Sequence, residues 1–187
     1  MLVIKYLIPE IFLSISIFSL LMIGVFIRNS FEIIYRLSLF VIFLMILIIL
    51  GGDNEPTKIF NESFTIDRFS LYSKVLIVIA TFFVLLMSKK YIVDIKNNKF
   101  EYPIIILLSI LGMFIMVSSN DLILFYLGLE LQSLALYILA SIDRDNIKSS
   151  EAGVKYFVLS ALSSGLLLYG CSLIYGFTGS TNFEEIA

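Results

Sequence analysis

Apolar runs, each close to the ~20 residues that a helix needs to cross a bilayer, constrain this chain more than any other feature. Charged residues fall mainly between the runs. Six membrane-spanning helices are therefore predicted, at residues 3–27, 31–50, 68–88, 103–118, 122–141 and 151–176. Short connections make consecutive helices antiparallel neighbours. The expected fold class is all-α integral membrane, with a single membrane domain over 1–187.

Composition excludes several classes of protein. The chain is 59% hydrophobic and 15% charged, with a mean hydropathy of +1.00, whereas a soluble domain is about half apolar and a quarter charged. A net charge of −2, without a basic excess, argues against nucleic-acid binding. Without His, and with Cys171 as the single cysteine, the chain by itself has no structural zinc site, haem or Fe–S ligation, disulfide framework or His-based catalytic triad.

The chain divides into three parts within its membrane domain. Residues 1–100 hold the first three helices with their loops, 101–176 hold the next three, and 177–187 form the start of a further helix or a tail. Thr181 followed three residues later by Glu184 is a capping-box pattern, which favours a new helix.

The distribution of Lys and Arg predicts the direction of the helices. Eight lie in or beside the connections after the first, third and fifth helices: Arg28, Arg36, Lys89, Lys90, Lys96, Lys99, Arg144 and Lys148. Three lie on the opposite side: Lys5, Lys58 and Arg68. We expect the N-terminus, the polar loop 51–67 and residue 187 to face the outer compartment. The basic loop 89–101 should face the matrix or cytoplasm.

Glu130 is the strongest candidate for a functional residue. It lies eight residues inside its helix, about 12 Å from the end, near the middle of the bilayer. A carboxylate at that depth costs several kcal/mol unless it is protonated, paired or hydrated. Residues on the same helical face form a polar stripe with it: Tyr126, Ser133, Tyr137 and Ser141. The pattern indicates a proton pathway; the alternative is a buried Glu held by hydroxyl groups for packing alone.

Lys155, near the start of the sixth helix, has two interpretations. Glu151 precedes it by four residues, which favours a local ion pair with a side chain that reaches water. Alternatively, the helix N-terminus disfavours its ammonium charge and makes Lys155 a proton relay directed toward the layer of Glu130. Lys74 is expected to extend its ammonium to the membrane surface, and Asp121 to cap the fifth helix. Ala161 and Gly165 favour close helix packing.

Three segments of the sequence resemble a known family. They are residues 121–134, around Glu130, residues 151–157, around Lys155, and the Gly- and Ser-rich stretch 163–181. They look like NADH dehydrogenase (ubiquinone) subunit 2, an antiporter-like membrane subunit of respiratory complex I. The resemblance is strong over 120–182 and weaker upstream. In this family Glu130 matches the fifth-helix glutamate of the proton pathway, and Lys155 matches a sixth-helix lysine.

The resemblance implies that the chain is the N-terminal part of a fourteen-helix antiporter-like subunit, with a role in proton translocation. The lysines expected on helices 7, 8 and 12 of the family lie outside this chain. A separate polypeptide would then supply the C-terminal part, with a lysine opposite Glu130. Other complex I membrane subunits and lipid are further expected partners. NADH, FMN, Fe–S clusters and ubiquinone would be bound by other subunits, because this chain contains no site for them.

Location and two other functions complete the expectations. The resemblance and an Ile-, Phe- and Asn-rich composition, typical of AT-rich genomes, predict a multi-pass protein of the mitochondrial inner membrane, with the bacterial inner membrane as the alternative. The chain is alternatively a related subunit of a chloroplast-type dehydrogenase or a cation/proton antiporter complex. A stand-alone six-helix structural membrane protein is the third possibility, which the polar stripe around Glu130 argues against.

Overall fold

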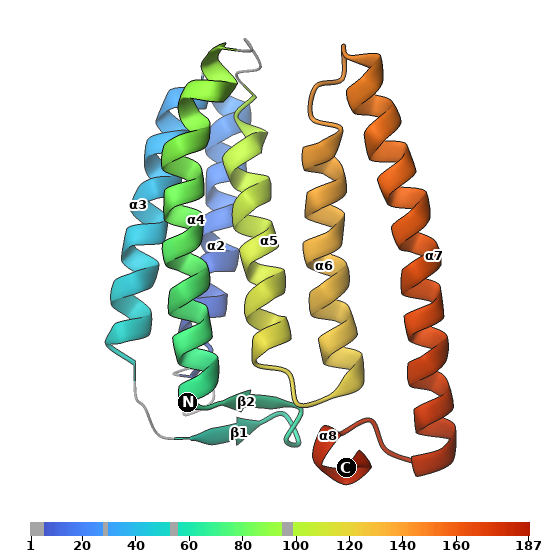
Figure 1. Cartoon of the computed structure of the whole chain (residues 1–187). Helices are drawn as coiled ribbons and strands as arrows, with labels where there is room; N and C mark the ends of the chain where they lie inside the picture. The colour runs from blue at the N-terminus through green and yellow to red at the C-terminus, as the bar shows by residue number, and fades with distance from the viewer. Residues whose placement is uncertain (1–5, 28–29, 53–55, 95–98) are drawn as a thin grey trace.

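The computed structural model describes residues 6–27, 30–52, 56–94 and 99–187. Within these ranges the chain forms six long helices and a short terminal one: α2 (Ile8–Phe26), α3 (Phe31–Leu50), α4 (Arg68–Asp94), α5 (Glu101–Val117), α6 (Leu122–Ala140), α7 (Ile147–Thr178) and α8 (Phe183–Ile186). The long helices alternate in direction, so α2 starts and α8 ends at the same end of the molecule (Figure 1). All-α membrane architecture is thereby confirmed.

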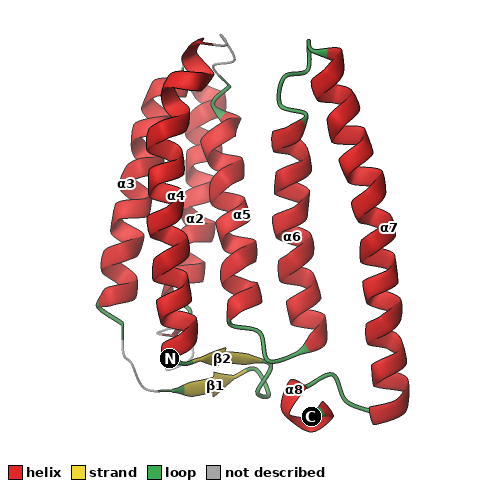
Figure 2. Ribbon diagram, viewed as in Figure 1, coloured by secondary structure: helices red, strands yellow, loops and turns green. Residues whose placement is uncertain are grey.

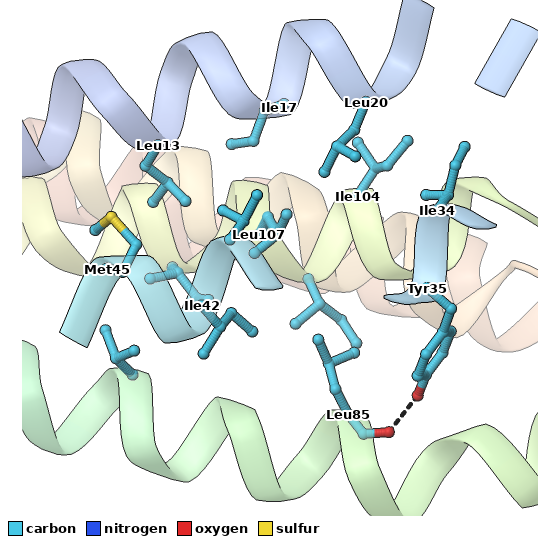
Figure 3. Packing of buried hydrophobic residues seen from close by; sticks show 14 of the residues in the cluster. Leu13, Ile17, Leu20, Ile34, Tyr35, Ile42, Met45, Leu85, Ile104 and Leu107 are labelled. Atoms are coloured by element: carbon cyan, nitrogen blue, oxygen red, sulfur yellow. Dashed lines mark hydrogen bonds between the residues drawn. The ribbon is translucent and has the colours of Figure 1, made fainter. Parts of the chain in front are cut away.

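Helices α2 to α5 form a compact four-helix unit, called the bundle below (Figure 2). Its core is a continuous apolar cluster: Leu13, Ile17 and Leu20 of α2 meet Ile34, Ile42 and Met45 of α3, Leu85 of α4, and Ile104 and Leu107 of α5 (Figure 3). Tyr35 adds a hydrogen bond from its hydroxyl to the carbonyl of Leu85. Because lipid tails are as apolar as these side chains, close packing rather than transfer out of water holds such a bundle together.

A β-hairpin closes one end of the bundle. Strand β1 (Thr57–Ile59) pairs antiparallel with β2 (Phe64–Ile66), and the apolar side chains of Ile59, Phe64 and Ile66 are buried against the bundle. The sequence pattern predicts a polar loop over residues 51–67 and does not reveal the hairpin within it. Strands of three residues bury too few alternating positions to stand out in a segment that also carries charge. We call this the hairpin end, and the opposite end the loop end.

Helices α6 and α7 form a second unit, called the arm. Helix α6 packs against α5, and α7 packs on the side of α6 that faces away from the bundle (Figure 1). Within the described chain, Gly153 is the single buried residue of α7. Many large apolar side chains of this helix are exposed, among them Phe157, Leu162 and Leu166.

The hairpin, the α5–α6 connection and the segment around α8 join at the hairpin end. Backbone hydrogen bonds run from Leu122 N to Thr181 O and from Phe183 N to Asn120 O. The Lys58 ammonium lies 2.5 Å from the Glu184 carboxylate. We call these contacts the clasp, because they connect the hairpin of the bundle to the far end of the arm.

Predicted helix positions are confirmed except at some boundaries. Helix α4 continues through Asp94, so the first part of the expected basic loop is helical. Helix α7 begins at Ile147 rather than 151. The capping box was wrong: Asn182, not Thr181, caps α8 and accepts from Glu184 N, while the Thr181 hydroxyl donates to Asp121. The start predicted for the first helix, residues 3–5, lies outside the described residues.

Candidate functional site

Helix α6 places Glu130 at its middle. Asp121 caps the helix as predicted, with Oδ1 accepting hydrogen bonds from Ile123 N at 2.8 Å and Leu124 N at 3.2 Å. The apolar run from Leu122 to Ala140 continues without charge except at Glu130. Eight residues separate Glu130 from the first helical residue, so it lies about 12 Å along the axis.

The polar stripe of α6 faces α7. The Tyr126 hydroxyl lies 2.8 Å from Ser164 Oγ, and the Tyr137 hydroxyl donates to Ser160 Oγ. The Tyr137 ring also packs edge-on against Tyr156, with ring centroids 4.8 Å apart. Ser133 and Ser141 instead donate to carbonyls of their own helix. The stripe is therefore an interface between two helices, with hydroxyl bridges on both sides of Glu130.

The carboxylate of Glu130 has unused hydrogen-bonding capacity. The residue is half-buried, and its Oε1 is shielded from solvent without a hydrogen-bond partner among the residues that the structure describes. A buried carboxylate oxygen without a partner is unfavourable, so this position requires a proton, a water molecule or a donor from elsewhere. The geometry therefore leaves Glu130 able to take up a proton or to pair with a cation.

Lys155 is not directed toward Glu130. Its ammonium lies 2.5 Å from Glu151 Oε1, and its side chain is 70% exposed. Gly153, Ser160 and Ser164 form the α6-facing side of α7, and Lys155 lies roughly opposite them around the helix. The expected orientation toward the layer of Glu130 is thus corrected, and the local ion pair is the arrangement observed. Lys155 also lies about 12 Å from the start of α7, beyond the first turn in which a helix dipole acts strongly.

A second polar site, which sequence reasoning missed, lies in the bundle. Lys74 Nζ is 2.6 Å from Glu10 Oε1, with the two side chains 2% and 10% exposed. The ammonium also lies 5.4 Å from the centroid of the Phe64 ring and 5.7 Å from that of Phe114. The expectation that Lys74 reaches the membrane surface is therefore wrong. Carboxylate and aromatic rings satisfy its charge inside the bundle.

The sequence did contain a signal for this ion pair. Glu10 and Lys74 are isolated opposite charges in the first two turns of α2 and α4, which both start at the hairpin end. Their depths therefore differ by only about 6 Å along the helix axes, within the reach of a lysine side chain. Predicting the pair required knowing that α2 and α4 face each other across the core, which periodicity does not provide.

The close helix packing predicted at Gly165 is found elsewhere. A Cβ on Gly165 would have no described atom within 4 Å, so this glycine lies on an open surface of α7. Gly112 and Gly128 instead bring the backbones of α5 and α6 together, where a Cβ on either would lie under 3.0 Å from the other helix. The expectation at Ala161 and Gly165 is therefore not met within the described chain.

Known families and proteins agree with the resemblance found in the sequence. Residues 119–187 match a family described as "NADH:quinone oxidoreductase/Mrp antiporter, TM". NADH-quinone oxidoreductase subunit N of Pelagibacter ubique is 51% identical over 97% of this chain, and that of Bartonella bacilliformis is 48% identical over 96%. The chain spans 39% and 37% of the length of these two relatives, and it fits an N-terminal part of the subunit.

Solved structures share the fold. A chain of respiratory complex I from Thermus thermophilus is 26% identical, with a TM-score of 0.78 over 93% of this chain and 38% of its own length. A chain of an archaeal membrane-bound sulfane sulfur reductase reaches a TM-score of 0.82 at 21% identity, over 98% of this chain. The second likeness concerns the fold alone. Together with the membrane-spanning helices, the relatives indicate a multi-pass inner-membrane protein.

Proposed function

We propose, starting from the homology of this chain to the N-terminal part of NADH-quinone oxidoreductase subunit N, that it belongs to the proton-translocating membrane arm of that enzyme. The observation that carries the proposal is Glu130, whose half-buried carboxylate lies at mid-helix with one oxygen unpartnered among the described residues. Ionisable groups at such a depth mark ion or proton pathways more often than packing. The redox chemistry belongs to other subunits, which bind NADH, FMN, Fe–S clusters and ubiquinone.

Each part of the arm has a role in this proposal. Glu130 exchanges a proton, or holds the charge of a lysine brought by a neighbouring helix. Tyr126 and Tyr137 bridge to α7 and keep the stripe in a polar, lipid-free environment. Lys155 points away from α6, so its proposed role is to pass charge toward helices that cover the outer side of α7 rather than directly to Glu130.

The proposed partner is the remainder of the subunit. The relatives are more than twice as long as this chain, and α7 presents an apolar surface with Lys155 at one end. Helices of the C-terminal part cover that surface and bring a lysine to within roughly 4 Å of the Glu130 carboxylate. We propose that other membrane subunits of the complex and lipid enclose the rest.

We propose the following orientation. The excess of Lys and Arg at the loop end faces the matrix or cytoplasm, and the hairpin end faces the outer compartment. The mitochondrial inner membrane remains a prediction, and the bacterial names of the relatives support the bacterial inner membrane as its alternative.

Substitution of Glu130 in the intact complex tests the function. We expect Glu130→Gln to assemble normally but to lose most of its proton translocation per NADH oxidised, because the amide cannot carry a proton. Glu130→Asp should be milder, since the charge is kept while the side chain shortens by one methylene. Glu32→Gln, at an exposed carboxylate of α3, is the matched control. Proton uptake by sealed membrane vesicles, normalised to the NADH oxidation rate, is the measurement.

Two results would contradict the proposal. Wild-type proton stoichiometry in an assembled Glu130→Gln complex would remove Glu130 from the pathway. A native gel in which mass spectrometry finds this chain without other subunits of the complex would favour the stand-alone structural protein. A band that contains the chain together with other subunits of the complex would support the proposal.

A further inference from the structure

A close contact between the backbones of α5 and α6 lies about half a helical turn from Glu130. A Cβ on Gly128 would lie 2.7 Å from Met116 N and 3.0 Å from Gly112 O. A Cβ on Gly112 would lie 2.6 Å from Gln132 N and 2.8 Å from Gly128 O. All of these are backbone atoms, so no change of side-chain rotamer makes room. The backbones of α5 and α6 therefore touch at a point that admits only glycine on both sides.

Glu130 stands directly behind this contact. Two residues along a helix lie on roughly opposite faces, so Gly128 faces α5 while Glu130 faces the α7 side. On that side, Tyr126 and Tyr137 bond to Ser164 and Ser160. Helix α6 is therefore held on both faces within about three turns around Glu130. The distance between α6 and α5 therefore determines how far the Glu130 carboxylate extends toward α7 and toward any helix beyond it.

We infer that Gly112 and Gly128 are positioning residues, whose backbone contact sets the location of the Glu130 carboxylate in the proton pathway. The inference rests on the proposed function of Glu130. Adding a methyl group at either glycine moves α6 away from α5 and presses the stripe against α7. Both glycines share one gap, so the same displacement follows from either substitution. Misplacement of a reacting group by about 1 Å is enough to cost on the order of a hundredfold in rate.

Other glycines of the chain provide matched controls. Gly24 lies in the bundle, where an added Cβ would meet the Phe100 ring at 2.4 Å and Ile34 Cδ1 at 2.6 Å. Gly24→Ala therefore disturbs packing through side chains, away from Glu130. Gly165 has no described neighbour within 4 Å of an added Cβ, so Gly165→Ala introduces a methyl group without a clash inside this chain.

The test uses the intact complex with Gly128→Ala, Gly112→Ala and the two controls. Proton translocation per NADH oxidised should fall about tenfold or more in both α5–α6 variants, per assembled complex. Gly24→Ala should lower the amount of assembled complex while each assembled copy pumps at the wild-type ratio. Gly165→Ala should leave the proton ratio unchanged.

A chemical readout separates positioning from general destabilisation. Dicyclohexylcarbodiimide, a hydrophobic reagent for carboxyl groups, labels membrane-embedded acids, and mass spectrometry locates the label at Glu130. We expect Gly128→Ala and Gly112→Ala to label more slowly than wild type, because α6 is pressed against α7. Gly24→Ala should label at the wild-type rate. The label is assigned with Glu130→Gln, in which it must disappear.

Wild-type labelling and a wild-type proton ratio in Gly128→Ala, beside a defective Glu130→Gln, would overturn the inference and leave the proposed function intact. Normal pumping by Glu130→Gln would overturn the proposed function, and the labelling rates would still decide whether the glycines position the carboxylate. Should neither glycine variant assemble, an experimental structure of the wild-type complex decides. A separation of more than 4 Å between α5 and a Cβ built on Gly128 would overturn the inference.

Discussion

The bundle and the arm satisfy their polar groups in different ways. In the bundle, the Lys74 ammonium is paired with Glu10 and flanked by two aromatic rings, all inside one apolar core. In the arm, the Glu130 carboxylate has an unpartnered oxygen among the described residues, and Lys155 is exposed beside Glu151. Each region has one buried carboxylate oxygen without a described partner, Glu10 Oε2 in the bundle and Glu130 Oε1 in the arm. The difference is that Glu10 is paired through its other oxygen with a buried cation of the same chain, whereas Glu130 has no cation beside it among the described residues.

Burial follows the same division. Side chains of all four bundle helices reach the core, including Leu13, Ile42, Leu85 and Leu107, each with at most 1% of its surface exposed. Helix α7 contributes only Gly153 to the buried residues of the described chain. The bundle therefore has a buried core of its own, whereas α7 has a largely exposed apolar surface within the described chain.

Breaking the ion pair of the bundle should give the largest effect. Glu10→Gln or Lys74→Met each leaves one buried charge without its partner, which costs about 3–5 kcal/mol. Glu10→Gln combined with Lys74→Met removes both charges and should recover most of that loss. The relative stability of the wild type, the two single variants and the double variant is measured by heating the complex in detergent and detecting release of the chain on native gels. A double variant less stable than both single ones would contradict the buried-pair interpretation.

Truncation of a leucine should give the second-largest effect, and its cost should differ between the bundle and the arm. Leu107→Ala opens a cavity in the bundle core and should cost about 2–5 kcal/mol. Leu162→Ala, on a side chain of α7 that is 66% exposed, should stay within about 0.5 kcal/mol in the isolated chain. The same unfolding measurement, made before and after assembly, checks this. A larger effect of Leu162→Ala after assembly would sharpen the comparison, because it would show that another helix contacts this side chain in the complex.

The clasp between the two regions should give the smallest effect. A hydrogen bond to Glu184 raises the pKa of Lys58, and desolvation opposes that rise. A lysine with a raised pKa in the folded state contributes its full stability below the unfolded value of about 10.4 and loses it as pH rises through the higher folded value. The contribution of this exposed pair should therefore persist across neutral pH and disappear only in strong alkali.

Lys58→Met is the variant for this measurement. It should lower the thermal midpoint slightly at pH 7 and not at all in strong alkali, where the wild-type lysine is also neutral. Lys90→Met, at an exposed lysine of α4 near the loop end, is the matched control. An equal effect of Lys58→Met at both pH values would show that the clasp depends on the backbone hydrogen bonds rather than on the ion pair.

Local patterns in the sequence determined where the helices lie and which residues share one face of α6. Apolar runs located all six long helices, because length and hydropathy of a span depend on the bilayer rather than on neighbouring helices. Helical periodicity placed Tyr126, Glu130 and Tyr137 on one face, and Asp121 capped α6 as expected. Such features involve residues within a few positions of one another, so they follow from the chain alone.

Tertiary structure alone decided which charges meet and where helices touch. Glu10 and Lys74 are 64 residues apart, and they pair across the bundle core because α2 and α4 point their charges inward at a similar depth. Lys155 lies away from α6 because the rotation of α7 is set by Gly153, Ser160 and Ser164, not by the local helix dipole. Gly112 and Gly128 became contacts only through the crossing of α5 and α6. The depth of a helix in the bundle, its rotation about its own axis and the point at which it crosses a neighbour are relations between helices. Hydropathy and periodicity describe one helix at a time, so they do not contain this information.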